Sequence, residues 1–124
     1  MANYLVDTCI LIDYFRGHAE AATFLDGLNA PPYLSSLTVA ELYAGVREGK
    51  ERGLLDALVS RFPVLPLDLD AAIKGGLYRR QYSNSHGTGM IDALLAASAE
   101  RKNLVLTTRN MKHFPMLENV HCPY

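Results

Sequence analysis

A short apolar run that stops at an acid and then resumes as a helix constrains this chain most. Residues 4–6 are apolar and strand-forming, and Asp7 follows them directly. From Thr8 to Phe15 the apolar residues recur at helical spacing. Ligands of a parallel sheet bind outside the carboxyl ends of its strands, so we expect Asp7 in a functional crevice. Asp is also a favoured N-cap residue, which leaves a purely structural role open at this point.

Strands and helices are predicted to alternate along the whole chain. Further strand-like runs are found at residues 33–35, 64–67 and 104–106, and helical periodicity at residues 8–15, 19–28, 39–46, 50–62, 68–82 and 90–98. This alternation predicts a three-layer α/β/α sandwich around a mainly parallel sheet of four or five strands. The chain has 124 residues and neither a repeat nor a linker, so residues 1–124 are expected to form a single domain.

The helix boundaries carry specific expectations. Thr38 and Glu41 have the spacing of a capping box, which would give Glu41 a structural role. Asp68 is expected to cap the helix that follows it. Residues 83–89 are the most loop-like stretch of the chain, and residues 107–110 are expected to leave the fourth strand as a loop.

Packing can also be predicted from the pattern of apolar residues. The helix at 50–62 is expected to pack against the helix before it. Ile73 and Leu77 are expected to face inward from the helix at 68–82. Pro66 cannot donate a hydrogen bond to a neighbouring strand, so the strand at 64–67 should be short or lie at a sheet edge.

Charge is distributed unevenly along the chain, although the net charge is only −1. Residues 74–113 contain seven Lys and Arg side chains against two acids, whereas the first 73 residues carry an acidic excess. A basic face beside an acidic pocket suits a metal-dependent enzyme that acts on a phosphate backbone. Solvated helix faces without a partner are the alternative reading of the same residues.

Cysteine content and hydropathy predict a protein of a reducing compartment that has no membrane-spanning segment. Cys9 and Cys122 do not form a metal-type cluster, so two free thiols are expected. No uninterrupted apolar stretch approaches the roughly 18 residues of a membrane helix. Asp7 interrupts the first apolar run before it reaches the length of a signal-peptide core. We therefore expect a cytoplasmic protein with no membrane association.

Three acids share one predicted placement near the carboxyl edge of the sheet. Asp7 ends the first strand, Glu41 lies early in the helix after the second, and Asp92 lies in the first turn of the helix before the fourth. The dipole of that helix would stabilise Asp92 by only about 0.3 to 1 kcal/mol, and its apolar neighbours demand a partner or a metal.

Carboxylates gathered in one pocket repel each other unless a cation lies among them. Oxygen ligands favour Mg²⁺, with Mn²⁺ as a possible substitute, whereas Zn²⁺ would require a set of Cys and His ligands. Such an ion lowers the pKa of bound water and stabilises charge on a phosphodiester. No Ser or Cys lies in a nucleophile elbow, so covalent catalysis is not supported.

Four segments resemble, in order and spacing, the signature segments of the PIN-domain family, and are most similar to its VapC-type toxins. They are VDTCILI (6–12), TVAELYAG (38–45), MIDALLAA (90–97) and LTTRNMKHF (106–114). The resemblance implies a Mg²⁺-dependent endoribonuclease that cleaves RNA with a metal-activated water. It also implies a cognate VapB-type antitoxin, a homodimer, and a transfer or ribosomal RNA as substrate.

Matched residue by residue, the resemblance places three acids in the metal site as catalytic residues: Asp7, Glu41 and Asp92. It places four further residues at the substrate: Thr8, Thr108, Arg109 and Asn110. The family often supplies a fourth acid from the loop after the last of these strands, whereas this chain has Thr108, Asn110 and His113 there. A second metal position would therefore depend on neutral groups, with His113 either ligating or facing solvent.

Other protein classes share part of this pattern. A haloacid-dehalogenase-like phosphatase needs a second Asp two residues after the first, where this chain has Cys9. A receiver domain needs a Lys after a late strand, where Thr107 and Thr108 stand. A PIN domain that binds RNA or a protein partner without cleaving RNA remains the main alternative, because the fourth acid is missing.

Overall fold

The computed structural model, which describes residues 3–124, contains five short strands that all run parallel. They are β1 (Tyr4–Val6), β2 (Leu34–Ser35), β3 (Val64–Leu65), β4 (Val105–Thr107) and β5 (Val120–His121). β1 pairs with β4 and β4 with β5, while β2 pairs with β3. A bridge between Leu5 and Tyr33 joins the two groups, which gives the order β3-β2-β1-β4-β5.

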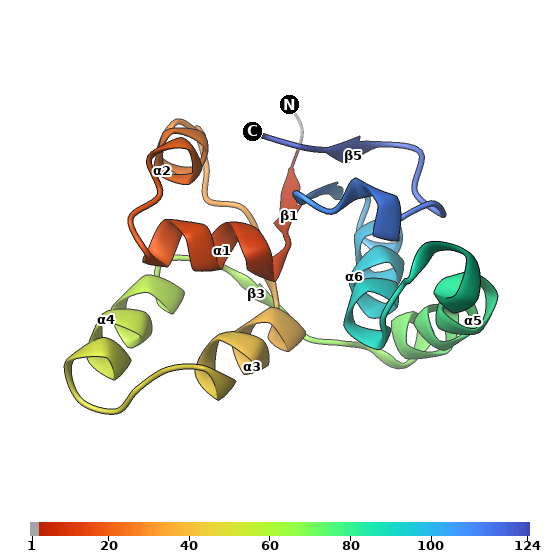
Figure 1. Cartoon of the computed structure of the whole chain (residues 1–124), viewed down its shortest axis with the longest axis horizontal. Coiled ribbons are helices and arrows are strands. Elements are labelled where there is room, and N and C mark those ends of the chain that lie inside the picture. Colours follow the sequence, from red (N-terminus) through yellow and green to blue (C-terminus); the bar gives the residue numbers. More distant parts are fainter. Residues whose placement is uncertain (1–2) are drawn as a thin grey trace.

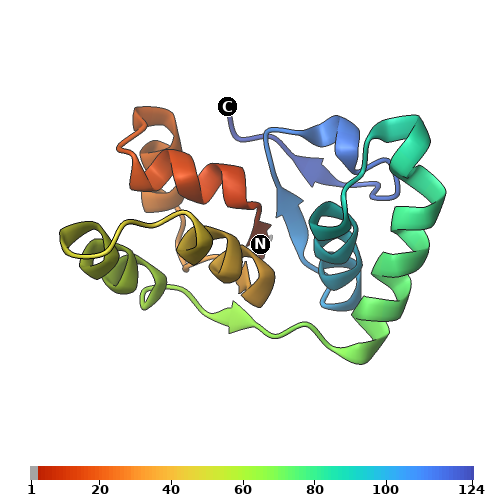
Figure 2. The ribbon, with the colours of Figure 1, turned by 60° about the horizontal axis from the view of Figure 1, so that its bottom comes forward.

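Helices cover both faces of this sheet. They are α1 (Thr8–Phe15), α2 (Ala19–Asp26), α3 (Ser36–Ala44), α4 (Lys50–Val59), α5 (Leu69–His86) and α6 (Met90–Arg101), with a 3-10 turn at Met111–His113. Figure 1 shows α1 to α4 on one side of β1, and α5 and α6 on the other. In Figure 2 β4 and β5 lie beside α6, whereas β3 lies at the far edge of the sheet.

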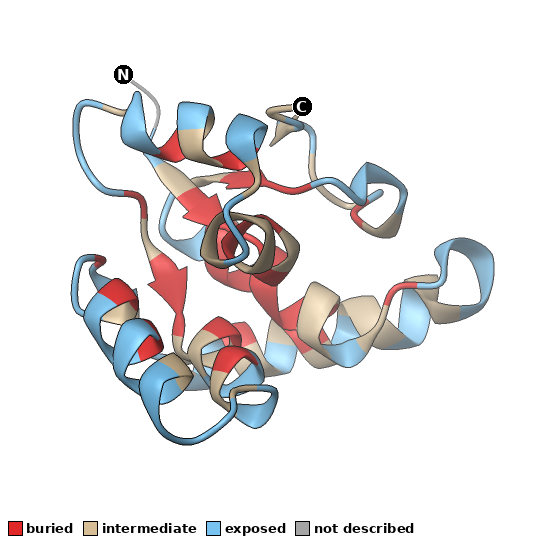
Figure 3. Cartoon of the chain, turned by 60° about the vertical axis from the view of Figure 1, so that its left-hand side comes forward, coloured by how far each residue is buried: buried red, intermediate tan, exposed pale blue. Residues whose placement is uncertain are grey.

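Two hydrophobic cores follow from the alternation of side chains along β1. Val6 packs with apolar residues of α1, α2, α3 and α4, whereas its neighbour Leu5 packs with residues of α6 and with Leu106 of β4. Successive strand residues point to opposite faces, so one short strand contributes to both cores. Figure 3 shows the buried residues along the strands and on the inward sides of the helices. The predicted α/β/α arrangement is confirmed.

The helix after β2 begins one turn earlier than predicted, so the capping box of Thr38 and Glu41 is wrong. Ser35 is the N-cap of α3, and its hydroxyl oxygen accepts from the backbone N–H of Leu37 at 3.1 Å. β2 ends at Ser35, so the last strand residue must itself cap the helix. Thr38 and Glu41 therefore lie inside α3, where their side chains are available for other contacts.

The inward orientation predicted for Ile73 and Leu77 is wrong, since these side chains are 55% and 47% exposed. α5 instead packs on α6 through its small residues, Ala71 and Gly75, both of which are buried. A Cβ at Gly75 would lie 2.6 Å from the side chain of Leu94, closer than atoms can approach. Close contact through these small residues leaves Ile73 and Leu77 on the outer face of α5.

α5 also extends further than predicted, because residues 83–86 are helical rather than part of a loop. The helix ends at Gly87, whose φ of 64° lies in the left-handed region that glycine tolerates best. Thr107 likewise belongs to β4 rather than to the following loop.

Other local predictions are confirmed. Asp68 caps α5 by accepting from the backbone N–H of Ala71 at 2.8 Å. β3 has two residues and lies at the sheet edge, and α4 packs against α3. Both cysteines are free thiols. Within residues 3–124 no helix is both long and apolar enough to cross a membrane.

Candidate active site

Asp7 occupies the carboxyl end of β1, where the central strands of the sheet meet. Its backbone N–H donates to the carbonyl oxygen of Thr107 at the end of β4 (2.9 Å), and its side chain is buried. The backbone N–H of Thr8 donates to Oδ1 at 2.7 Å, and the hydroxyl of Thr108 donates to Oδ2 at 2.7 Å. Both oxygens of this carboxylate are therefore held in a fixed orientation.

The electrostatics around Asp7 favour a cation nearby. Burial is the largest effect and raises its pKa above the ordinary value, against the opposing influence of the hydrogen bonds from Thr108 and Thr8. The negative charge of Asp92 raises the pKa of Asp7 further, because a nearby like charge disfavours the ionised carboxylate. A buried acid next to a second acid is poorly solvated as an anion, and a bound cation would relieve both effects.

Asp92 lies in the first turn of α6, as predicted. Its Oδ2 accepts from the backbone N–H of Gly89 at 3.3 Å and lies 3.3 Å from Nδ1 of His113. The carboxylate thus has a capping role, while its charge acts on Asp7. His113 faces Asp92 rather than solvent, which settles the orientation that the sequence leaves open.

Glu41 reaches the site through Thr8. The Thr8 hydroxyl donates to Oε1 of Glu41 at 2.6 Å and lies 3.2 Å from the hydroxyl of Thr38. Thr8 also donates its backbone N–H to Asp7, so one residue links two of the predicted acids. The residue Glu41 is exposed on the surface of α3. Its long side chain can rotate without disturbing the core.

The donor chemistry of these residues fits a hard cation such as Mg²⁺ or Mn²⁺. Carboxylate and hydroxyl oxygens dominate the site, and zinc-type ligation by several Cys and His is not found there. Among the described residues, no three His, Cys, Asp or Glu side chains lie close enough to hold an ion together as they stand. Asp7 and Asp92 are the interacting pair, and Glu41 would have to turn toward them.

The loop after β4 contributes groups of different kinds. The backbone N–H of Asn110 donates to the Thr108 hydroxyl oxygen at 3.0 Å, while the residue itself is exposed. Nη1 of Arg109 donates to Oδ2 of Asp13 at 2.9 Å, and its guanidinium lies over the ring of Tyr124. Asp13 and Tyr124 were not predicted as site residues, because periodicity carries no information on which distant segments meet.

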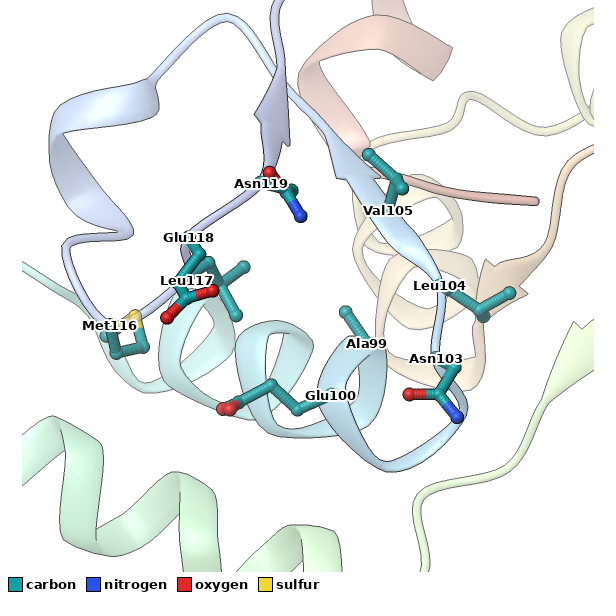
Figure 4. Close-up of a pocket in the computed structure, with 9 residues that line it drawn as sticks. All are labelled: Ala99, Glu100, Asn103, Leu104, Val105, Met116, Leu117, Glu118 and Asn119. Atoms are coloured by element: carbon teal, nitrogen blue, oxygen red, sulfur yellow. The ribbon is translucent and has the colours of Figure 1, made fainter. Parts of the chain in front are cut away.

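A separate cavity of about 420 Å³ lies at the amino ends of β4 and β5, away from the carboxyl ends where Asp7 lies. Figure 4 shows its lining, which comes from the end of α6, the start of β4 and the segment before β5. Glu100 and Glu118 are its acids, and none of the three predicted metal ligands lines it. The carboxyl edge that holds Asp7 therefore remains the candidate site.

Comparison with known proteins agrees with this arrangement, since the PIN domain matches residues 4–115. The chain belongs to the PIN-domain family. This PIN domain is similar to "Ribonuclease VapC19" of Mycobacterium tuberculosis, with 39% identity over 97% of the chain and 98% of the relative. "Ribonuclease VapC10" of the same organism is 36% identical over 97% of the chain and 92% of the relative.

Solved structures place the same fold in assemblies with a second protein. One chain of a "Toxin-antitoxin complex from Klebsiella pneumoniae" matches this PIN domain with a TM-score of 0.85 and 29% identity, covering 98% of each chain. VapBC2 from Rickettsia felis, solved bound to a DNA fragment from its promoter, matches with a TM-score of 0.76 and 27% identity over 95% of each chain. The predicted family and fold are confirmed.

Proposed function

We propose that this PIN domain is a Mg²⁺-dependent endoribonuclease and the toxin component of a type II toxin-antitoxin pair. The buried carboxylate of Asp7 at the carboxyl edge of the sheet carries the proposal, because hydrogen bonds from Thr8 and Thr108 hold both of its oxygens where a cation would bind. The relatives named as VapC ribonucleases supply RNA as the substrate class. The toxin-antitoxin structures supply a VapB-type antitoxin as the partner.

Each site residue has a distinct part in this proposal. Asp7 and Asp92 would hold the ion, and Glu41 would complete the ligand set after turning from Thr8. When bound, the ion supplies an acidified water and stabilises negative charge on the phosphodiester. Thr108 and the backbone of Thr8 keep the carboxylate of Asp7 in place, so this ligand is already oriented before substrate binds.

Antitoxin-free protein tests the proposed activity. Cleavage of a mixture of cellular RNAs should require Mg²⁺ and stop with EDTA. Asp7→Asn and Asp92→Asn should each lower the cleavage rate by about a hundredfold or more, which corresponds to about 2.7 kcal/mol of transition-state stabilisation. Asp70→Asn, which removes an exposed carboxylate from α5, is the matched control and should cleave normally.

The outcomes separate the enzyme from a PIN domain that only binds. RNA that binds tightly but stays intact in Mg²⁺ and in Mn²⁺ would contradict the nuclease proposal and favour the non-catalytic alternative. Cleavage that persists at full rate in EDTA would contradict the metal requirement instead. Thermal unfolding of each variant shows whether a loss of activity reflects a loss of the fold.

A further inference from the structure

Arg109 directly follows the site residue Thr108, and two side chains hold its guanidinium. Nη1 donates to Oδ2 of Asp13 at 2.9 Å, and the hydroxyl of Tyr124 donates to the same oxygen at 2.7 Å. The guanidinium carbon lies 5.2 Å from the centre of the Tyr124 ring, which in turn stacks on His18 at 5.1 Å. Asp13, Arg109 and Tyr124 are called the Arg109 clamp below.

The backbone of Arg109 is fixed as firmly as its side chain. It directly follows Thr108, whose hydroxyl donates to Asp7, and it precedes Asn110, whose backbone N–H donates to the same Thr108 hydroxyl oxygen. The clamp therefore sets the direction of a cationic side chain whose main chain is already anchored to the carboxylate site.

An RNA phosphate approaching this site meets several carboxylates and would be repelled without a cation at the rim. A guanidinium has five N–H donors in a planar fork that suits phosphate oxygens, and the contact with Asp13 uses Nη1 alone. The Arg109 side chain is 46% exposed, so solvent and a ligand can reach it. Holding the fork in one orientation before binding reduces the entropy lost when phosphate binds.

We propose that Asp13 and Tyr124 are positioning residues that hold Arg109 to bind an RNA phosphate beside the Asp7 site. This inference rests on the proposed function, because it takes RNA as the substrate. Arg109 contacts the substrate backbone, whereas Asp13 and Tyr124 act only through Arg109. The Arg109 clamp should therefore govern RNA affinity and leave the chemical step nearly unchanged.

Two other groups of Arg, Asp and Tyr show that such a cluster alone does not imply a function. In one of them the hydroxyl of Tyr43 donates to Asp56 at 2.6 Å, and Arg52 donates to the same oxygen at 3.3 Å. Arg52 also lies 5.2 Å from the centre of the Tyr43 ring. This second cluster joins α3 to α4 on an exposed surface, so it provides a matched control.

The test compares Tyr124→Phe with Tyr43→Phe, since each removes one phenol hydroxyl from an Asp that also pairs with an Arg. Steady-state cleavage of a single-stranded RNA should show KM raised about tenfold by Arg109→Ala, the loss expected for charged hydrogen bonds. Tyr124→Phe should raise KM in the same direction by a smaller factor with kcat nearly unchanged. Tyr43→Phe should change neither constant.

Two further measurements distinguish positioning from general destabilisation. RNA binding by Arg109→Ala should depend less on salt. The slope of log binding constant against log salt concentration should fall in magnitude by about 0.7, the value for one lost phosphate contact. Tyr124→Phe combined with Arg109→Ala should be no worse than Arg109→Ala alone, because Tyr124 acts through Arg109. Equal KM for Tyr124→Phe and Tyr43→Phe, or additive effects in the double variant, would overturn the inference.

Failure of the proposed function would look different. If the unchanged protein cleaves no RNA, binding of a fluorescent single-stranded RNA still compares it with Arg109→Ala and Tyr124→Phe. Weaker binding in both variants would support the Arg109 clamp in a non-catalytic domain. Unchanged binding in Arg109→Ala would overturn the Arg109 clamp whether or not RNA is cleaved.

Discussion

Thr108 donates a 2.7 Å hydrogen bond to Oδ2 of Asp7, although the two residues are separated by 101 positions in the sequence. The parallel register of β1 and β4 places their ends side by side, with Val6 opposite Thr107, so the next residue of each strand lies at the same edge. This contact orients the central carboxylate of the site and joins the first segment of the chain to its last third.

Thr108→Val keeps the shape of the side chain and removes its hydroxyl. The variant loses the bond to Asp7 and leaves the backbone N–H of Asn110 without the oxygen it donates to. We expect the free energy of unfolding at neutral pH to fall by about 1 to 3 kcal/mol in urea titrations. Thr23 is an exposed residue of α2 whose hydroxyl donates to the carbonyl oxygen of Ala19. Thr23→Val should change the free energy of unfolding by less than about 0.5 kcal/mol. Equal effects would contradict a special role for Thr108.

Asp7→Asn should stabilise the metal-free protein at neutral pH. The folded-state pKa of Asp7 is raised above its ordinary 3.8, chiefly by burial, so the folded state binds the proton more tightly than the unfolded state. The stability contributed by protonated Asp7 is fully present below pH 3.8 and is lost as the pH rises through the pKa of the folded state. The difference in free energy of unfolding between Asp7→Asn and the wild-type protein should therefore grow with pH across that window and then level off.

Urea unfolding in EDTA from about pH 4 to pH 8 measures this advantage directly. Asp70→Asn removes an exposed carboxylate and controls for a general change of charge. The explanation fails if Asp7→Asn loses stability relative to the unchanged protein as pH rises.

The missing fourth acid predicts a preference for manganese. Mg²⁺ favours carboxylate and water ligands, whereas Mn²⁺ tolerates imidazole better, and His113 lies 3.3 Å from Asp92. RNA cleavage should therefore be faster in Mn²⁺ than in Mg²⁺, and Asn110→Asp should improve the rate in Mg²⁺. His113→Ala should remove part of the manganese preference. An unchanged preference in His113→Ala would exclude His113 from the metal site.

The homodimer implied by the resemblance stays a prediction, and we expect its interface on the outer face of α5. Leu69, Ile73 and Leu77 are spaced four residues apart on this helix and are 74%, 55% and 47% exposed. Ile73→Glu should convert a dimer to a monomer in sedimentation experiments while the fold remains stable. Leu54→Glu changes an equally exposed residue of α4 and should leave the dimer intact. A dimer that survives Ile73→Glu would assign the interface to another surface.

Much of this arrangement could be predicted from local patterns. The run from Tyr4 to Asp7 identified a strand that ends at an acid, and the structure places Asp7 at that position with both oxygens held. The alternation of strands and helices was sufficient to predict a parallel sheet, because parallel strands are joined by crossover connections that are usually helices. Asp68 was also confirmed as the cap of α5.

The failures have one physical cause, which is that local pattern does not determine tertiary contact. Apolar spacing predicted that Ile73 faces inward, but the close approach of α5 and α6 at Gly75 reversed the orientation of that helix. Thr38 matched a capping box, but the direct passage from β2 into α3 moved the cap to Ser35. The contact of Tyr124 with Asp13 had no local signal at all.

Calorimetric titration of Mg²⁺ into antitoxin-free and RNA-free protein tests the central claim most directly. The unchanged protein should bind one ion tightly per chain, whereas Asp7→Asn and Asp92→Asn should bind none under the same conditions and Asp70→Asn should bind normally. Tight binding of an ion by Asp7→Asn with unchanged affinity would contradict the assignment of the metal site, and two tight ions per chain in the unchanged protein would contradict its ligand count.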